Sequence, residues 1–215
     1  QAAVRPIPLA TIRALDFAPF TPDAPAPVLR LAATNPRVRD HFRSFDGIWT
    51  GSNTRDVRPW WRVDAADVWL PLSGGQGHQP WVTPVRLRMR AGAVAAQPDR
   101  SGGIEYPRVA GRRLGARLAP PHTASLAGVV TFVPRHGEAD ARVHELLAVF
   151  NSRIGGAWLR TLTSGLNFNP GYAAEIPLGG DSPGPALLAA AAEAIAVRGA
   201  MVAADPTHDG FAGVP

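Results

Sequence analysis

The amphipathic stretch at residues 138–162 limits the possible folds of this chain more than any other segment. Its apolar residues recur at spacings of three and four, which is typical of a helix with one buried face. These residues are Val143, Leu146, Leu147, Phe150, Ile154, Trp158, Leu159 and Leu162. Acidic Glu138 and Asp140 suit the first turn of such a helix, and Gly155-Gly156 is expected to kink or split it. A helix of this kind needs another layer of structure to cover its apolar face.

Short apolar runs before this helix predict that layer to be β-sheet. Strands are expected at residues 68–72, 113–118 and 126–133, and the last is apolar enough to be central and buried. Residues 82–90 alternate apolar side chains with Arg86, Arg88 and Arg90, as in a strand with two different faces. The arginine face is either solvated or directed at phosphates. Because βαβ alternation is absent, the sequence predicts an α+β fold with mixed or antiparallel sheets of short strands and a long amphipathic helix.

Composition shifts suggest three parts. Residues 1–44 are a proline-rich lead-in with a short helix, since proline fixes φ and removes a hydrogen-bond donor. Residues 45–180 contain the predicted strands and the long helix. Residues 181–215 are expected to form an alanine-rich C-terminal helix over residues 186–202 and a frayed tail.

The charged residues favour a polyanionic partner. All 22 basic residues are arginines, against 17 acidic residues, and the net charge is +5. The planar guanidinium suits phosphates and guanine edges, although a mild positive excess proves no partner. The absence of cysteine excludes disulfides and Cys-type metal sites and fits a cytoplasmic protein. No wholly apolar run reaches the roughly 18 residues of a membrane span, so no membrane partner is expected. The chain begins at Gln1, which is consistent with a fragment or a processed chain.

Motifs for catalysis fit poorly. Ser182 lies in a G-x-S-x-G match, but the match is in a predicted loop and proline follows the serine, unlike a nucleophile elbow. His136 and His144 lack the i, i+4 spacing of a zinc-binding helix, so no metal site is predicted. The glycine loop at residues 74–77 fits no phosphate-binding motif, although glycines permit a close backbone approach to a ligand. Five of the six tryptophans, Trp49, Trp60, Trp61, Trp69 and Trp81, are each expected in the core, with stacking on bases as the alternative.

Three blocks of residues stand in a fixed order along the chain. The first is G-S-N-T-R-D-V-R-P-W-W-R-V at residues 51–63. The second is W-L-P-L-S-G-G at residues 69–75, followed by Trp81. The third comprises Leu146, Leu147, Asn151-Ser152, Leu166-Asn167-Phe168, Gly171 and Ile176-Pro177.

Together these blocks resemble the C-terminal target-recognition half of adenine-specific DNA methyltransferases, in particular the fused type IIG restriction–modification enzymes and the BREX phage-defence methyltransferases (PglX). The family pattern G-D-N-x-R-F-x-R-x-W-x-E-V is matched at Gly51, Asn53, Arg55, Arg58, Trp60 and Val63. The chain departs from that pattern at Ser52, Asp56 and Arg62. In the second block, Ser73 stands near the place of the family's lysine. The resemblance covers residues 45–178.

The resemblance implies a target-recognition-domain-like fold that reads double-stranded DNA beside a methyltransferase catalytic domain. That domain would belong to the same parent chain or to a separate subunit. The parent would use S-adenosylmethionine and flip its target adenine out of the duplex. This sequence contains no Asn-Pro-Pro-Tyr motif and no glycine-rich methyl-donor loop. We therefore expect the chain itself to be non-catalytic and to hold no cofactor.

Candidate DNA contacts follow from the blocks and from the loops beside them. They are Asn53, Arg55, Arg58, Trp60, Gly74, Gly75, Gln76, His78, Arg112, Arg113, Arg117, Asn167 and Asn169, with Arg86 and Arg88 as further phosphate contacts. Asparagine and glutamine pair bidentately with adenine, but Asn167 and Asn169 could instead build an Asx-type turn. Two other functions stay open: a split methyltransferase subunit that is active only with a partner chain, and a degenerate protein-interaction module.

Overall fold

The computed structural model describes residues 9–13, 26–74, 77–93, 102–111, 113–135, 140–163, 165–180 and 182–211. The helices are α1 (Leu9–Arg13), α2 (Ala26–Thr34), α3 (Val38–His41), α4 (Asn53–Asp56), α5 (Asp140–Asn151), α6 (Arg153–Leu162), α7 (Pro170–Ala174) and α8 (Pro185–Ala203), with 3-10 turns η1 (Trp60–Arg62) and η2 (Ala91–Ala93). The strands are β1 (Phe42–Asp46), β2 (Val57–Pro59), β3 (Trp69–Ser73), β4 (Trp81–Val82), β5 (Leu87–Arg90), β6 (Ile104–Pro107), β7 (Arg117–Leu118), β8 (Ala124–Ser125) and β9 (Val129–Pro134).

Two sheets of short strands confirm the predicted α+β class. The larger sheet has the order β1-β9-β6-β7-β4 and the smaller one β2-β5-β3-β8. Most neighbours are antiparallel, whereas β3 with β8 and β4 with β7 are parallel. Strand β9 lies between β1 and β6, and its residues Val129, Val130, Thr131 and Phe132 are buried, as the apolar run at residues 126–133 predicted.

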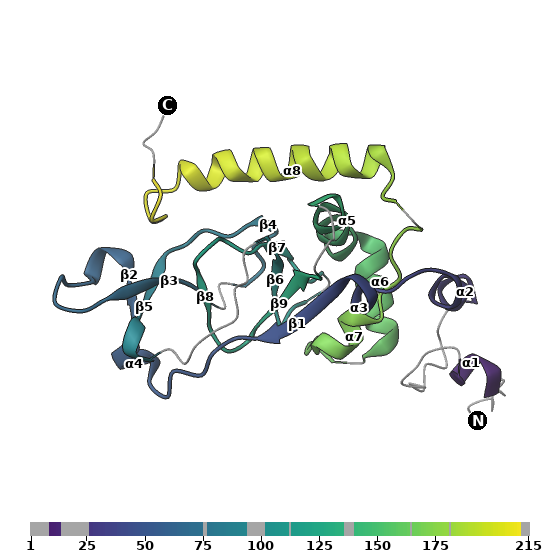
Figure 1. Ribbon diagram of the computed structural model, residues 1–215, viewed down its shortest axis with the longest axis horizontal. Helices are drawn as coiled ribbons and strands as arrows, with labels where there is room; N and C mark the ends of the chain where they lie inside the picture. Colours follow the sequence, from purple (N-terminus) through teal and green to yellow (C-terminus); the bar gives the residue numbers. More distant parts are fainter. Residues whose placement is uncertain are drawn as a thin grey trace, which may run out of the picture.

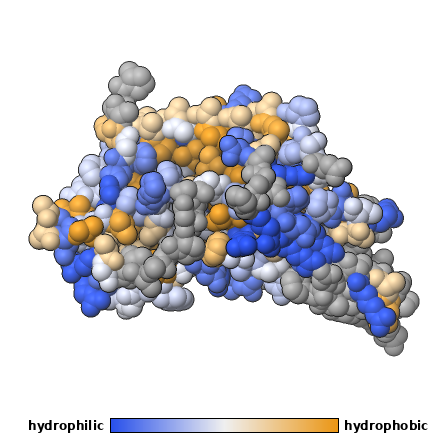
Figure 2. All heavy atoms as spheres, in the orientation of Figure 1, coloured by the Kyte–Doolittle hydropathy of each residue, from blue (hydrophilic) through white to orange (hydrophobic). Residues whose placement is uncertain are grey.

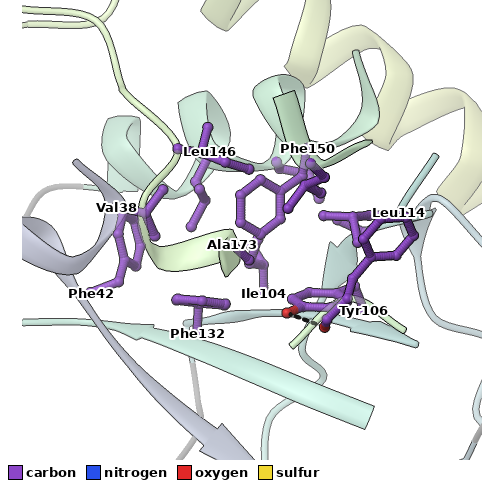
Figure 3. Close-up of a cluster of buried hydrophobic side chains, with 14 of the residues drawn as sticks. Val38, Phe42, Ile104, Tyr106, Leu114, Phe132, Leu146, Phe150 and Ala173 are labelled. Atoms are coloured by element: carbon purple, nitrogen blue, oxygen red, sulfur yellow. Dashed lines mark hydrogen bonds between the residues drawn. The ribbon is translucent and has the colours of Figure 1, made fainter. Parts of the chain in front are cut away.

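The main core lies between α5 and the larger sheet (Figure 3). Phe150 of α5 meets Tyr106 of β6 and Phe132 of β9 edge-on, with ring centroids 5.8 Å and 5.7 Å apart. The Tyr106 hydroxyl donates to the Phe168 carbonyl at 3.1 Å, which ties the segment before α7 to the sheet. Edge-to-face packing of this kind stabilises a core beyond the area that it buries. A second, smaller core of Leu72, Met89 and Ala124 belongs to the four-stranded sheet.

The long amphipathic segment is two helices, and they part before Gly155-Gly156 rather than at it. The Ser152 hydroxyl accepts the Gly155 N–H at 3.0 Å and so caps the start of α6. A Cβ on Gly155 would lie 2.1 Å from the Val149 carbonyl oxygen, so only glycine allows α6 to start this close to α5. The prediction of a split was right but its position was wrong, because the capping preference of serine set the break. The new helix direction leaves Ile154 72% exposed.

The first residues of the larger sheet precede the predicted boundary at residue 44. Val38 and Phe42 are buried in the main core, and β1 runs through residues 44 and 45 while pairing with β9. The Val38 N–H donates to the Ile176 carbonyl, and the Leu178 N–H donates to the Pro36 carbonyl. Residues 36–46 are therefore packed with elements from the C-terminal half. The three-part division of the chain stays a prediction.

Helix α8 runs along one side of the molecule, where it contacts α5 and β4 (Figure 1). Its burial is slight: Ala191 and Val202 are buried, whereas Val197 and Met201 are 58% and 59% exposed. Figure 2 shows apolar side chains gathered along this edge. Among the described helices, α8 alone is long and apolar enough to cross a membrane, judged by its 19 residues and its composition.

Candidate nucleic-acid interface

The predicted contacts of the first block come from α4, β2 and η1, at the edge of the smaller sheet. Asn53 is exposed, and its Oδ1 accepts the Thr50 hydroxyl at 2.6 Å. Arg55 is 68% exposed and pairs at 2.8 Å with the buried carboxylate of Asp56. The hydrogen bond between the two side chains raises the pKa of Arg55 and lowers that of Asp56. The carboxylate of Asp56, which stands where the family pattern has phenylalanine, therefore partly neutralises the charge of Arg55.

Arg58 and Trp60 from the same block are tied to neighbouring backbone. Arg58 is half-buried and donates to the carbonyls of Thr54 and Val57. The Trp60 indole N–H donates to the Thr207 carbonyl at 3.0 Å. These contacts already use polar groups of both side chains. The assignment of Arg58 and Trp60 as DNA contacts stays a prediction.

The second group lies near the glycine loop after β3. Gly74 is buried, whereas His78 and Arg113 are exposed. The ideal Cβ position on Gly115 is 2.6 Å from His78 Nδ1, so the loop and the segment before β7 are in close contact. Gly115 adopts φ +63°, a conformation that favours glycine. The predicted contacts Gly75, Gln76 and Arg112 lie outside the described residues.

Arg117 is a predicted contact that the structure contradicts. Its side chain is 0% exposed, and its Nε donates to Glu105 Oε1 at 2.7 Å. One Nη also lies 3.4 Å from the Gly74 carbonyl oxygen. A guanidinium with no accessible surface cannot touch a phosphate. Arg117 instead contacts the backbone of the glycine loop from inside the protein. Ser73, which stands near the place of the family's lysine, is also buried and donates to Glu105.

The third group is the segment before α7. Asn167 and Asn169 are both exposed. Backbone pairing fixes them: Val109 forms a bridge with Asn167, and the Phe168 N–H donates to the Arg108 carbonyl at 2.8 Å. Asn169 precedes the first residue of α7, and its side chain makes no capping hydrogen bond there. Its amide is therefore not used as a helix cap.

An open groove lies beside the first group and reaches Arg108, whose backbone pairs with Phe168 of the third group. It has a volume of about 420 Å³ and is lined by Ile48, Trp49, Thr50, Gly51, Asn53, Arg108, Ala127 and Gly128. Arg108 forms an ion pair with Asp46 at the end of β1. Trp49 is 87% exposed, so the expectation of a core position was wrong for this residue.

Sequence reasoning missed both Trp49 and Arg108 as groove residues. The signal for Trp49 was its setting, because it stands between Gly47 and Gly51 without the apolar periodicity of a core strand. Arg108 had no such signal, since only the pairing of residues 108–110 with 166–168 brings it beside the Asn167 segment.

The arginine face of residues 82–90 is partly exposed, with side-chain exposures of 25–38%, and its arginines are held in ion pairs. Arg86 pairs with Asp205, and Arg88 pairs with Asp209. The Asp209 N–H also donates to the Val85 carbonyl at 2.9 Å. Hydrogen bonds from Thr207, followed by the contact with Arg86, lower the pKa of Asp205. The predicted frayed tail is therefore docked at least through Asp209, because Asp205 and Asp209 neutralise Arg86 and Arg88.

Comparison with known proteins gives likenesses of shape. No protein-family model matches the chain, and no curated protein matches it in sequence. An HsdS subunit from Thermoanaerobacter tengcongensis is 13% identical, with a TM-score of 0.44 over 91% of this chain and 44% of that one. A type I restriction-modification S subunit from M. genitalium is 13% identical, with a TM-score of 0.47 over 80% of this chain and 42% of that one.

A third solved structure, described as showing complex assembly and conformational transition of the type I R-M system, is 12% identical with a TM-score of 0.47. It is matched over 91% of this chain and 46% of that one. The chain thus spans less than half the length of each of these three proteins.

Proposed function

We propose that this chain is the DNA sequence-specificity module of an adenine-specific DNA methyltransferase of the type IIG or BREX group, in restriction–modification or phage defence. One observation favours this function over the others. Asn53 from the first block lies in one groove with Arg108, and the backbone of Arg108 pairs with Phe168, the residue after Asn167 of the third block. Exposed amides beside an arginine are the side chains that read base edges and hold phosphates.

The division of labour in the proposal follows from the sequence. Methyl transfer would belong to a catalytic domain, in the same parent chain or on a partner subunit, which holds S-adenosylmethionine and the flipped adenine. The residues of this chain do not fit a methyl-donor site, because neither the glycine-rich loop nor the Asn-Pro-Pro-Tyr motif is present. No step of the transfer is therefore assigned to them. The role proposed here is to grip a duplex in the cytoplasm and set its register.

The experiment is binding of the full chain to duplex DNA while salt is varied. A module that neutralises several phosphates loses affinity steeply, with a slope of about −0.9 per phosphate in a plot of log K against log salt. A slope near zero, or equal binding to a neutral polymer, would sink the proposal.

Two double variants separate grip from readout. Arg112→Ala with Arg113→Ala should weaken binding to every sequence and flatten the salt slope. Asn53→Ala with Asn167→Ala should reduce discrimination between sequences by about 1–3 kcal/mol for each base read. Arg30→Ala with Arg153→Ala is the matched control, because these exposed arginines lie on α2 and α6, away from α4 (Figure 1). If the control weakens binding as much as the first variant, net charge rather than a site governs affinity.

The two remaining functions predict different results. A split methyltransferase subunit would methylate DNA only after a catalytic chain is added, and the neighbouring reading frame would encode an Asn-Pro-Pro-Tyr motif. A degenerate interaction module would show no change in thermal stability when polyanions are added. This test of a degenerate module is worth making because the chain departs from the family pattern at Ser52, at Asp56 and at the missing lysine.

A further inference from the structure

The tryptophan at position 49 is exposed although the backbone just before it is fixed. Ile48, the residue before it, donates its N–H to the Ser125 carbonyl and accepts from the Ala127 N–H, both at 2.7 Å. The side chain of Ile48 packs against the smaller core. A Cβ on Gly47 would lie 2.0 Å from the Leu126 carbonyl oxygen, so the chain is pressed against the residue that follows β8. Trp49 is therefore a large ring presented to solvent from a rigid support.

The groove beside Trp49 has the size of a site for a planar ring. Its volume of about 420 Å³ lies within the roughly 300–1,000 Å³ of ordinary ligand pockets. Gly51 and Gly128 line it with φ of +78° and +93°, and no atom lies within 4 Å of a Cβ on either residue. Space next to the indole is therefore open at both glycines.

The polar groups of the groove determine which chemical groups a ligand must carry to bind there. The Thr50 hydroxyl occupies one lone pair of Asn53 Oδ1, which leaves the Asn53 NH₂ available as a donor. Arg108 adds a cation, partly balanced by Asp46. A ligand with a ring face, a hydrogen-bond acceptor on the ring edge and a nearby anion meets all three groups. A nucleotide has this combination.

We infer that this groove binds one unstacked nucleobase, with its ring on Trp49, its acceptor edge on Asn53 and its phosphate beside Arg108. The inference rests on the proposed DNA-binding function and adds a ring-face site to it. Inside an intact duplex the base faces are hidden and only the edges are accessible. A large exposed indole therefore gains contact only where stacking is interrupted, as at a bulged or displaced base.

The test compares three DNA duplexes that differ at one position: intact, with a single bulged guanine, and with an abasic bulge of the same backbone. The full chain should bind the guanine bulge about 5- to 100-fold more tightly than the abasic bulge, as expected for one stacked base. Trp49→Ala should abolish that ratio, and Trp49→Phe should retain part of it. Because Trp49 is 87% exposed, neither substitution should unfold the chain.

Trp61→Ala is the matched control, since Trp61 is 51% exposed and does not line the groove. It should leave the ratio unchanged. Equal binding of the guanine and abasic bulges by the unaltered chain, or an unchanged ratio in Trp49→Ala, would overturn the inference. If salt-dependent binding to the intact duplex persists in that case, the proposed function stands without the stacking site. If the chain binds none of the three duplexes, both fail.

Discussion

Arg117 Nε donates to Glu105 Oε1 at 2.7 Å, and the two side chains are 0% and 1% exposed. The same carboxylate oxygen accepts the Thr83 hydroxyl at 2.8 Å and the Ser73 hydroxyl. Ser73 belongs to the smaller sheet, whereas Glu105 and Arg117 belong to the larger one. The joint between the two sheets is therefore polar and charged rather than apolar.

Removing one member of this pair should destabilise the fold strongly. Glu105→Ala leaves a buried guanidinium without its counter-ion, which costs about 3–5 kcal/mol. Replacing both residues, as in Glu105→Leu with Arg117→Met, should recover part of that loss because no unpaired charge is left. Urea unfolding measures both values. The control is Asp67→Ala, which breaks the exposed pair with Arg90 and should cost less than about 1 kcal/mol. A Glu105→Ala variant as stable as that control would show that the joint is hydrated.

A second prediction compares two helical glycines. Gly155→Ala should destabilise the chain by about 1–3 kcal/mol, because the added methyl group meets the Val149 carbonyl at 2.1 Å. Gly199→Ala in α8 should instead stabilise it by about 0.5–1 kcal/mol, since its Cβ meets nothing and alanine favours a helix. Thermal unfolding of both variants checks the signs. Two shifts in the same direction would contradict the proposed close approach of α6 to α5.

Elements that rest on a repeating pattern could be predicted, and contacts between distant segments could not. The apolar run of β9 and the alanine-rich α8 were both located from sequence, because burial and helix propensity leave local signatures. Arg117 looks like any other arginine in the sequence, and its burial depends on Glu105 reaching it from a neighbouring strand. The same holds for Arg108, which lies in the groove because its N–H bonds the Gly128 carbonyl and its side chain pairs with Asp46.

The burial of Tyr106 should make the stability of the fold decrease at alkaline pH. Burial raises the pKa of Tyr106, so its neutral phenol is favoured in the folded state. In the unfolded chain the phenol ionises near pH 10. The stabilisation is therefore complete below about pH 10 and falls as the pH rises further. The chain has two tyrosines and neither lysine nor cysteine, so few other groups titrate in this range.

The measurement is the melting temperature between about pH 8 and 12, together with tyrosinate absorbance. Tyr106→Phe should be less stable at neutral pH, because the hydrogen bond to Phe168 is lost, but its stability should fall less steeply above pH 10. Tyr172→Phe keeps Tyr106 in place and should retain the steep fall. Tyrosinate absorbance from Tyr106 before unfolding would contradict its burial.

The last prediction concerns the acidic C-terminal segment on β5. Asp205 and Asp209 hold Arg86 and Arg88, two arginines that alternate along one strand face and would otherwise be available to phosphates. Asp205→Asn with Asp209→Asn should therefore strengthen binding to any duplex. Two arginines released to phosphates would make the salt slope more negative by up to about 1.8, at about 0.9 for each contact.

The pKa of Asp205 lies below its ordinary value, so its contribution is present above about pH 4 and is lost only as the pH falls further. The gain in DNA affinity of the double variant over the unaltered chain should accordingly be the same at pH 6 and pH 8. The matched control is Asp64→Asn with Glu193→Gln, two exposed carboxylates that pair with no described arginine, so the net charge changes by the same two units without freeing an arginine. Because net charge alone also strengthens DNA binding, a steeper slope in the double variant than in this control is the decisive result. Equal slopes would assign Asp205 and Asp209 to anchoring α8 on the sheet, with no part in controlling the arginine face.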